Sequence, residues 1–274
     1  MRSLLRFAVL LVAVAPNLAC VNLAEIRAFA DTSSQSAQYT ELVDDYVDAA
    51  LRSKPFAPEG TGSAFDDIAK ERLAQKPKLI ALHKGIAGYM DAMGKLAADE
   101  LTSFDKELDG FGKALTSGDI LDDDQVKAYG GLAKLVAKAF TDGWRRAELE
   151  KMIEGGHAPF MVVIGKLRTF VVRGIIGALE EERQWVTDAY DRMNFTDEGL
   201  KTLARIQKAD RLAVIDNRIK AANKYAELLG KIGKGHEELH AKKANLEADD
   251  LLNTIFGYAQ EIATVFGQIK NLGD

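Results

Sequence analysis

The stretch RLAVIDNRIKAANKYAELL, residues 211–229, decides the fold class of this chain. Its apolar residues recur every three or four positions, at Leu212, Ile215, Ile219, Ala222, Ala226 and Leu229. A helix with this spacing carries an apolar stripe along one side, and the 3-4 alternation is typical of a seam between packed helices. Residues 211–229 therefore predict a long helix that packs within a bundle.

The same periodicity returns along most of the chain. Helical spacing of apolar residues is found in 36–52, 86–115, 126–147, 161–193 and 252–269. Asp122–Asp124 would open one helix and Thr196 or Asp197 would cap another, since such residues favour helix N-termini. No sustained alternation of apolar and polar residues indicates a half-buried strand. We expect an all-α fold, an elongated antiparallel bundle of about five long helices.

Prolines and a glycine pair are expected to separate these helices, because proline lacks a backbone donor and breaks helices. The prolines that fall between periodic segments are Pro55, Pro58, Pro77 and Pro159. Gly155-Gly156 indicates a turn that extends from Glu154 to Pro159. Between these joints we expect residues 37–274 to form a single helical-bundle domain.

The N-terminus has the pattern of an export signal. Arg2 and Arg6 make the first residues basic, and a short apolar run covers Phe7–Ala15. Asn17-Leu18-Ala19-Cys20 follows, and Cys20 is the only cysteine of the chain. A basic region, a short apolar run and a small residue before the cysteine resemble the start of bacterial lipoprotein precursors. The resemblance covers residues 1–20 alone.

This resemblance implies removal of residues 1–19 as a signal peptide and lipidation of Cys20. Residues 20–36 would then be the lipidated cysteine and a tether. In lipoprotein precursors an Asp after the cysteine is associated with retention at the inner membrane. Val21 stands there, so the resemblance implies the periplasmic side of the outer membrane. Ordinary secretion after Ala28-Phe29-Ala30 is the alternative.

Charge and composition restrict the classes of partner. The chain has 36 basic and 41 acidic residues and a net charge of -5, whereas nucleic-acid binding needs a basic footprint. The most apolar stretch, 159–179, is interrupted by Lys166, Arg168 and Arg173, so we expect a buried helix there and no membrane span. Glu180-Glu181-Glu182-Arg183 indicates a solvated helix face with local ion pairs.

The motif with the most specific chemistry is His236-Glu237-Glu238-Leu239-His240, an H-E-x-x-H. On a helix the two histidines share a face and can bind zinc, and Glu237 could act as general base on a metal-bound water. Glu261, 21 residues beyond His240, is the candidate third ligand. The pattern resembles the zincin metallopeptidases over these two short stretches.

Other interpretations compete with the zinc site. Glu238, Lys242 and Lys243 place charges inside and after a motif that is uncharged in zincins. Alternatively, His236 and His240 extend the seam of residues 211–229 by helical steps. A second E-x-x-H, from Glu154 to His157, would make a pair of the kind found in di-iron bundles, but the expected turn at Glu154–Pro159 would keep it off a helix.

We therefore expect a lipid-anchored, non-enzymatic helical protein that faces the periplasm and binds another protein, as an accessory or immunity module of the bacterial cell envelope. No cofactor follows from this hypothesis. The alternative is a membrane-anchored zinc metallopeptidase that uses His236, Glu237, His240 and Glu261.

Overall fold

The computed structural model describes residues 23–100, 118 and 120–273. Within these ranges the chain is all-α, as the sequence predicts, and its long helices agree approximately with a bundle of about five. The main helices are α1 (Ala24–Ala37), α2 (Glu41–Ser53), α3 (Gly62–Ala97), α4 (Asp123–Thr141), α5 (Leu149–Phe170), α6 (Ile176–Arg192), α7 (Glu198–Ala241) and α8 (Asp249–Gly273). Cys20 and the rest of the expected signal lie outside the described residues.

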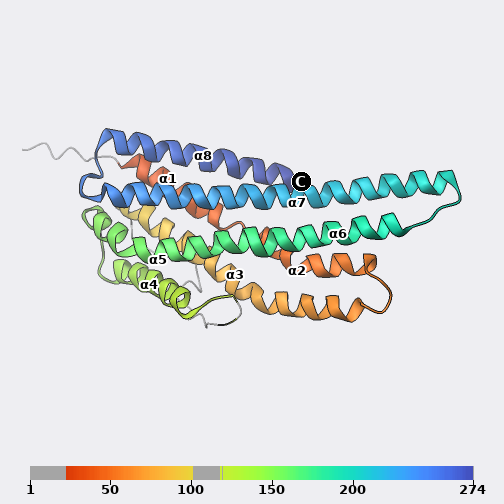
Figure 1. Ribbon diagram of the computed structural model, residues 1–274. Coiled ribbons are helices and arrows are strands. Elements are labelled where there is room, and N and C mark those ends of the chain that lie inside the picture. Colours follow the sequence, from red (N-terminus) through yellow and green to blue (C-terminus); the bar gives the residue numbers. More distant parts are fainter. Residues whose placement is uncertain (1–22, 101–117, 119, 274) are drawn as a thin grey trace, which may run out of the picture.

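Two long rods run the length of the molecule (Figure 1). One is α5 and α6, which a π-helical turn at Val171–Ile175 joins into a continuous helix. The other is α7, which returns antiparallel to the first rod. Asp197 caps the start of α7 through the Leu200 amide, and Asp122 caps α4 through the Gln125 amide. Both caps agree with the sequence prediction.

The remaining helices divide the bundle into two halves. We call α1, α4, α5, α8 and residues 221–241 of α7 the proximal half. We call α2, α6, residues 62–76 of α3 and residues 198–218 of α7 the distal half. Helix α8 packs on α1 and α7 in the proximal half and stops midway along α7 (Figure 1). Among the described residues, α8 therefore adds a layer to the proximal half alone.

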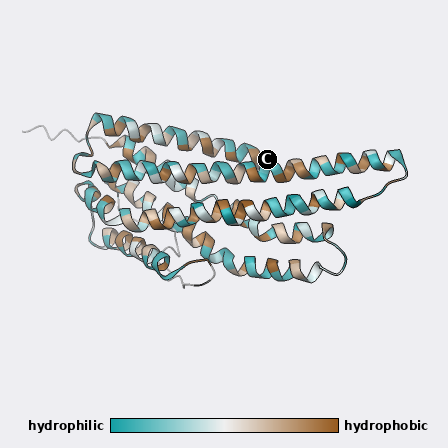
Figure 2. Cartoon of the chain, viewed as in Figure 1, coloured by the Kyte–Doolittle hydropathy of each residue, from teal (hydrophilic) through white to brown (hydrophobic). Residues whose placement is uncertain are grey.

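The main core extends over both halves. It includes the fully buried Phe29 and Phe160 of the proximal half, and Leu42 of α2, Leu179 of α6 and Ile215 of α7 in the distal half. The distal half adds a small separate cluster of Ala50, Phe65 and Ala69, against which Trp185 packs. Hydrophobic residues nevertheless recur along α7 on both sides of the point where α8 ends (Figure 2).

Three expected joints are wrong. Pro77 lies inside α3 and Pro159 inside α5, and α5 also runs through Gly155-Gly156 without a turn. Gly156 is needed for a close contact, because a Cβ there would lie 2.3 Å from the Tyr89 ring. Packing of buried faces outweighs the penalty of about 3 kcal/mol for proline in a helix interior.

The expected tether is wrong from Ala24 onward. Residues 24–37 form α1, and Ile26, Phe29 and Ala30 are fully buried against the bundle. The apolar residues of this stretch therefore belong to the core and not to a linker. The helix expected from 36 begins at Glu41, and the one expected over 86–115 ends at Ala97, while residues 101–115 lie outside the described residues.

Hydropathy does not make any of these helices a membrane span. Across the described residues, no helix combines the length and the apolar composition needed to cross a bilayer.

Candidate functional site

The H-E-x-x-H motif lies inside the C-terminal part of α7, as the extension of the seam predicts. Its three key residues face different surroundings. His236 is fully buried, His240 is partly exposed and Glu237 is exposed beside a shallow groove between α5 and α7. His236 therefore belongs to the core, whereas His240 is partly accessible to solvent.

A third histidine completes a stack. His157 of α5 lies parallel to His240, with ring centroids 3.8 Å apart, and parallel to His236, with centroids 5.5 Å apart. Phe160 and Tyr89 pack on the other side of His236. Because α5 is a helix at Glu154–Pro159, His157 reaches α7, and the expected turn would have kept it away. We call His157, His236 and His240 the histidine stack.

The hydrogen bonds of the stack have a definite direction. The Tyr89 hydroxyl donates to the Met152 carbonyl oxygen at 3.1 Å, so it accepts from Nε2 of His236 at 2.7 Å. Nδ1 of neutral His236 then accepts from Nδ1 of His157 at 3.4 Å. Burial and the neighbouring histidines lower the pKa of His236 to about 3, and burial also lowers the pKa of His157. The buried end of the stack is uncharged at neutral pH.

At the exposed end of the stack, the carboxylate of Glu154 lies beside His240 and Lys243. Glu154 of α5 lies 3.4 Å from Nε2 of His240 and 2.6 Å from Nζ of Lys243. The hydrogen bond from Lys243 holds the pKa of the Glu154 carboxyl below its usual value. Glu154 therefore ties α5 to the end of α7.

The zinc ligands suggested by the sequence do not converge. Nε2 of His236 is bonded to Tyr89, and Glu261 of α8 forms an ion pair of 2.5 Å with Lys231. Among the described residues, no three His, Cys, Asp or Glu side chains are grouped so that they could hold a metal ion. The contacts of the histidine stack are instead those of side chains packed and hydrogen-bonded within a core. Glu237 lies outside the stack.

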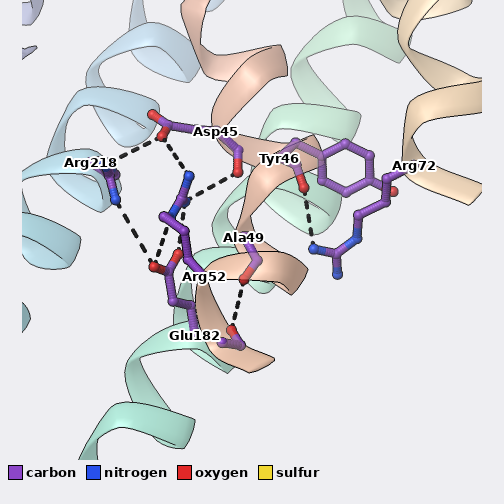
Figure 3. A network of polar contacts seen from close by, with 8 residues as sticks. Asp45, Tyr46, Ala49, Arg52, Arg72, Glu182 and Arg218 are labelled. Atoms are coloured by element: carbon purple, nitrogen blue, oxygen red, sulfur yellow. Dashed lines mark hydrogen bonds and ion pairs between the residues drawn. The ribbon is translucent and has the colours of Figure 1, made fainter. Parts of the chain in front are cut away.

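The distal half contains a second polar cluster, shown in Figure 3. Arg52 of α2 donates to both carboxylate oxygens of Glu182 of α6, at 2.8 Å each. Asp45 of α2 lies 3.4 Å from Arg52 and 3.1 Å from Arg218 of α7. We call Asp45, Arg52, Glu182 and Arg218 the charged wall. It links α2, α6 and α7 through ion pairs.

Burial raises the pKa of the Asp45 carboxyl, against the attraction of Arg218 and Arg52, which lowers it. The Glu182 side chain is only 5% exposed. The charged wall contains two carboxylates and two guanidinium groups, so its charges are balanced. This pairing offsets the free-energy cost of removing the charges from water. The wall therefore links α2 to both α6 and α7.

Two clefts lie on either side of this wall. A cleft of about 500 Å³ opens between α6 and α7, next to Phe56 and Tyr190. A groove of about 400 Å³ runs between α2 and α7 and reaches Leu272 near the end of α8. We call the second the α2/α7 groove. Arg52, Val214 and Arg218 line both.

Helix α7 carries an uncovered apolar face beside these clefts. Leu200, Leu203, Val214, Ala221 and Leu228 are separated by three, seven or eleven residues, so they lie on one side of the helix. Ala221 and Leu228 are 4% and 0% exposed, whereas Leu200, Leu203 and Val214 are 55%, 50% and 50% exposed. Gln207, Asp210 and Arg211 lie between Leu203 and Val214 on this part of α7, so the exposed apolar residues form two separate groups.

Sequence reasoning found the two histidines of α7 but missed Tyr89, the role of His157 and the whole charged wall. The paired E-x-x-H spacing was the available signal for His157. Nothing in the sequence marks Asp45, Arg52, Glu182 and Arg218 as a set, because they come from three helices that only packing brings together.

Comparison with family models, with curated proteins and with solved structures finds no match to this chain.

Proposed function

We propose that this chain is a lipid-anchored helical lipoprotein on the periplasmic side of the outer membrane, and that it binds another protein through its distal half. It acts as a non-enzymatic accessory or immunity module of the cell envelope. The observation that supports the binding role is a set of exposed large apolar residues on α7, with Leu200 and Leu203 near its start and Val214 beside both clefts.

The exposure of apolar side chains to water supports a binding role. Single exposed apolar residues are ordinary, but several on one helix, with Val214 lining two clefts, favour a protein-binding surface. The charged wall adds rigidity, because it fixes α2, α6 and α7 in position before any partner arrives. A preformed surface loses less conformational entropy on binding.

The lipid anchor is supported by the sequence around Cys20 and is tested separately. Cells fed a labelled fatty acid should incorporate label into the wild-type chain and not into Cys20→Ala. The variant should move from the membrane fraction to the soluble periplasmic fraction. A Cys20→Ala protein that stays in the membrane at unchanged mass contradicts the anchor and leaves the binding role open.

The binding role is tested by photocrosslinking in cells. A photoreactive residue at Leu203 should give one discrete crosslinked species. The same residue at Val162, an exposed apolar position on α5 of the proximal half, should give none. Equal crosslinking from both positions, or none from Leu203, removes the proposed binding surface.

A further inference from the structure

Helix α1 is built into the bundle. Its residues Ile26, Phe29 and Ala30 are fully buried. Two glycines of neighbouring helices make room for it, because a Cβ at Gly235 of α7 would lie 2.5 Å from the Phe29 ring and a Cβ at Gly94 of α3 would lie 3.2 Å from the Cβ of Ala30. Helix α1 therefore fits closely against both α3 and α7.

This packing bears on where an export signal can be cut. Ordinary secretion with a cut after Ala30 would remove Ile26, Phe29 and Ala30 from the core and leave the space beside Gly235 empty. Loss of large buried side chains is strongly destabilising, because the neighbouring residues close the cavity only in part. A cut before Cys20 keeps every residue of α1.

A chain cut before Cys20 has very little backbone between its lipid and its folded part. Leu23 is already buried, with 4% of its side chain exposed, and Val21 and Asn22 alone separate it from Cys20. Three residue steps span at most about 11 Å of extended chain. A lipidated Cys20 in a bilayer would therefore hold Leu23 within about this distance of the membrane surface.

Helix α1 begins at the end of the bundle where α7 ends and α8 begins (Figure 1). The turn at Lys243–Asn245 follows α7 at this end. We call the start of α1, residues 242–248 and the start of α8 the proximal end. Helix α7 has 44 residues, so the loop between α6 and α7 lies about 66 Å away at a rise of 1.5 Å per residue.

The basic side chains at the proximal end that could attract anionic headgroups already have acidic partners. The pairs are Arg27 with Asp31 and Glu100, Lys242 with Asp250, and Lys243 with Glu154. Because these charges are compensated within the bundle, electrostatic attraction to an anionic membrane is weak. The short connection to the lipid is then what keeps this end at a membrane.

From this geometry we propose that the mature chain keeps α1 and that the lipid on Cys20 seats the proximal end of the bundle directly on the bilayer surface. The bilayer is the partner of this end. The distal half points away from it, with Leu200 and Leu203 accessible to a protein partner. This inference rests on the proposed lipid anchor and adds which surface of the anchored protein the membrane contacts.

The test places one fluorophore at either end of α7. Asn245→Cys and Asn194→Cys replace exposed asparagines in the turns that follow and precede this helix. Each new thiol is labelled specifically, because lipidation blocks Cys20, the only native cysteine. The full lipidated chain is reconstituted into phosphatidylcholine vesicles that contain a lipid with a quencher on its headgroup. We expect quenching at least about fivefold stronger at Asn245 than at Asn194, since the two ends lie about 66 Å apart.

A linker separates the effect of the short connection from affinity for lipid. Insertion of about twenty Gly and Ser residues between Asn22 and Leu23 should lower quenching at Asn245 at least about threefold, because such a linker has a root-mean-square span of about 25 Å. Unlipidated Cys20→Ala should not bind vesicles with or without phosphatidylglycerol. Equal quenching at the two positions, quenching at Asn245 that the linker leaves unchanged, or vesicle binding by Cys20→Ala overturns the inference.

The failure of this inference can be told apart from failure of the proposed anchor. Mass spectrometry of the mature chain from cells identifies its first residue and any attached lipid. A mature chain that begins at Asp31 without lipid overturns both the anchor and the inference. A chain that begins with lipidated Cys20 but is quenched equally at both ends overturns the inference alone. Photocrosslinking from Leu203 tests the binding role independently of both.

Discussion

Leu228 and Leu203 lie on the same side of α7, yet Leu228 is fully buried and Leu203 is half exposed. The proximal half uses close contacts between apolar surfaces, with the neutral His236 stacked inside. The distal half contains a balanced set of paired charges, and Leu203 and Val214 of α7 are half exposed there. The same helix thus runs from a part where its apolar side is buried into a part where several of its apolar side chains are exposed.

The first prediction sets these two leucines against each other. Leu228→Ala should lower the free energy of unfolding by about 3 kcal/mol, because it leaves a cavity in a packed core. Leu203→Ala should lower it by less than about 0.5 kcal/mol, because its side chain is already in water. Urea denaturation measures both. Similar losses would mean that α7 is covered along its whole length in solution, which would remove the contrast between the halves.

The sequence predicted the helices more reliably than the breaks between them. Apolar spacing at 211–229 reports which side of a helix is buried, and that information is local. Whether Pro159 or Gly155-Gly156 ends a helix depends on packing with distant residues, in this case the contact between Gly156 and Tyr89. Local breaking signals were therefore overruled by tertiary contacts that no local pattern reports.

For the candidate sites, too, the sequence predicted local features but not the contacts between distant residues. The helical spacing of His236 and His240 was readable, but their partners Tyr89 and His157 come from other helices. Glu182 belongs to a run that indicates a solvated face, and that interpretation is wrong for this residue, because it is buried against Arg52. Glu181 next to it is solvated, as the pattern predicts.

The second prediction concerns pH and the proximal half. The pKa of His236 is lowered by burial to about 3 in the folded chain, so its contribution to stability is fully present above the unfolded pKa of about 6.5. It is lost as pH falls below that value, because only the unfolded chain takes up the proton. Between about pH 7 and pH 5 this should cost about 2 kcal/mol.

Substitution isolates the histidine responsible. His236→Gln cannot titrate, so its unfolding free energy should fall less steeply over this pH range than that of the wild type. His240→Gln, at the partly exposed end of the stack, should keep most of the wild-type slope. The buried His83, whose pKa burial lowers to about 4, contributes the same sign in all three proteins. Identical slopes for His236→Gln and the wild type would show that His236 is accessible to protons in the folded state.

The third and smallest prediction concerns the distal half and uses two adjacent glutamates. Glu182→Ala should lower the free energy of unfolding by about 1–2 kcal/mol, because Arg52 loses its bidentate partner. The loss stays below that of a fully buried pair, since Arg52 and Arg218 are 24% and 32% exposed and water can reach them. Glu181→Ala removes a 70% exposed partner of Arg72 and should cost less than about 0.5 kcal/mol.

Hydrogen exchange decides whether the charged wall serves the distal half alone. In Glu182→Ala, amides of α2 should exchange faster while those of α1 keep their protection, because the wall joins α2 to α6 and α7 and α1 is held by the proximal core. Equal acceleration in α1 and α2 would mean that the bundle opens as one cooperative unit. Faster exchange confined to α2 would instead show that the charged wall stabilises the distal half independently of the histidine stack.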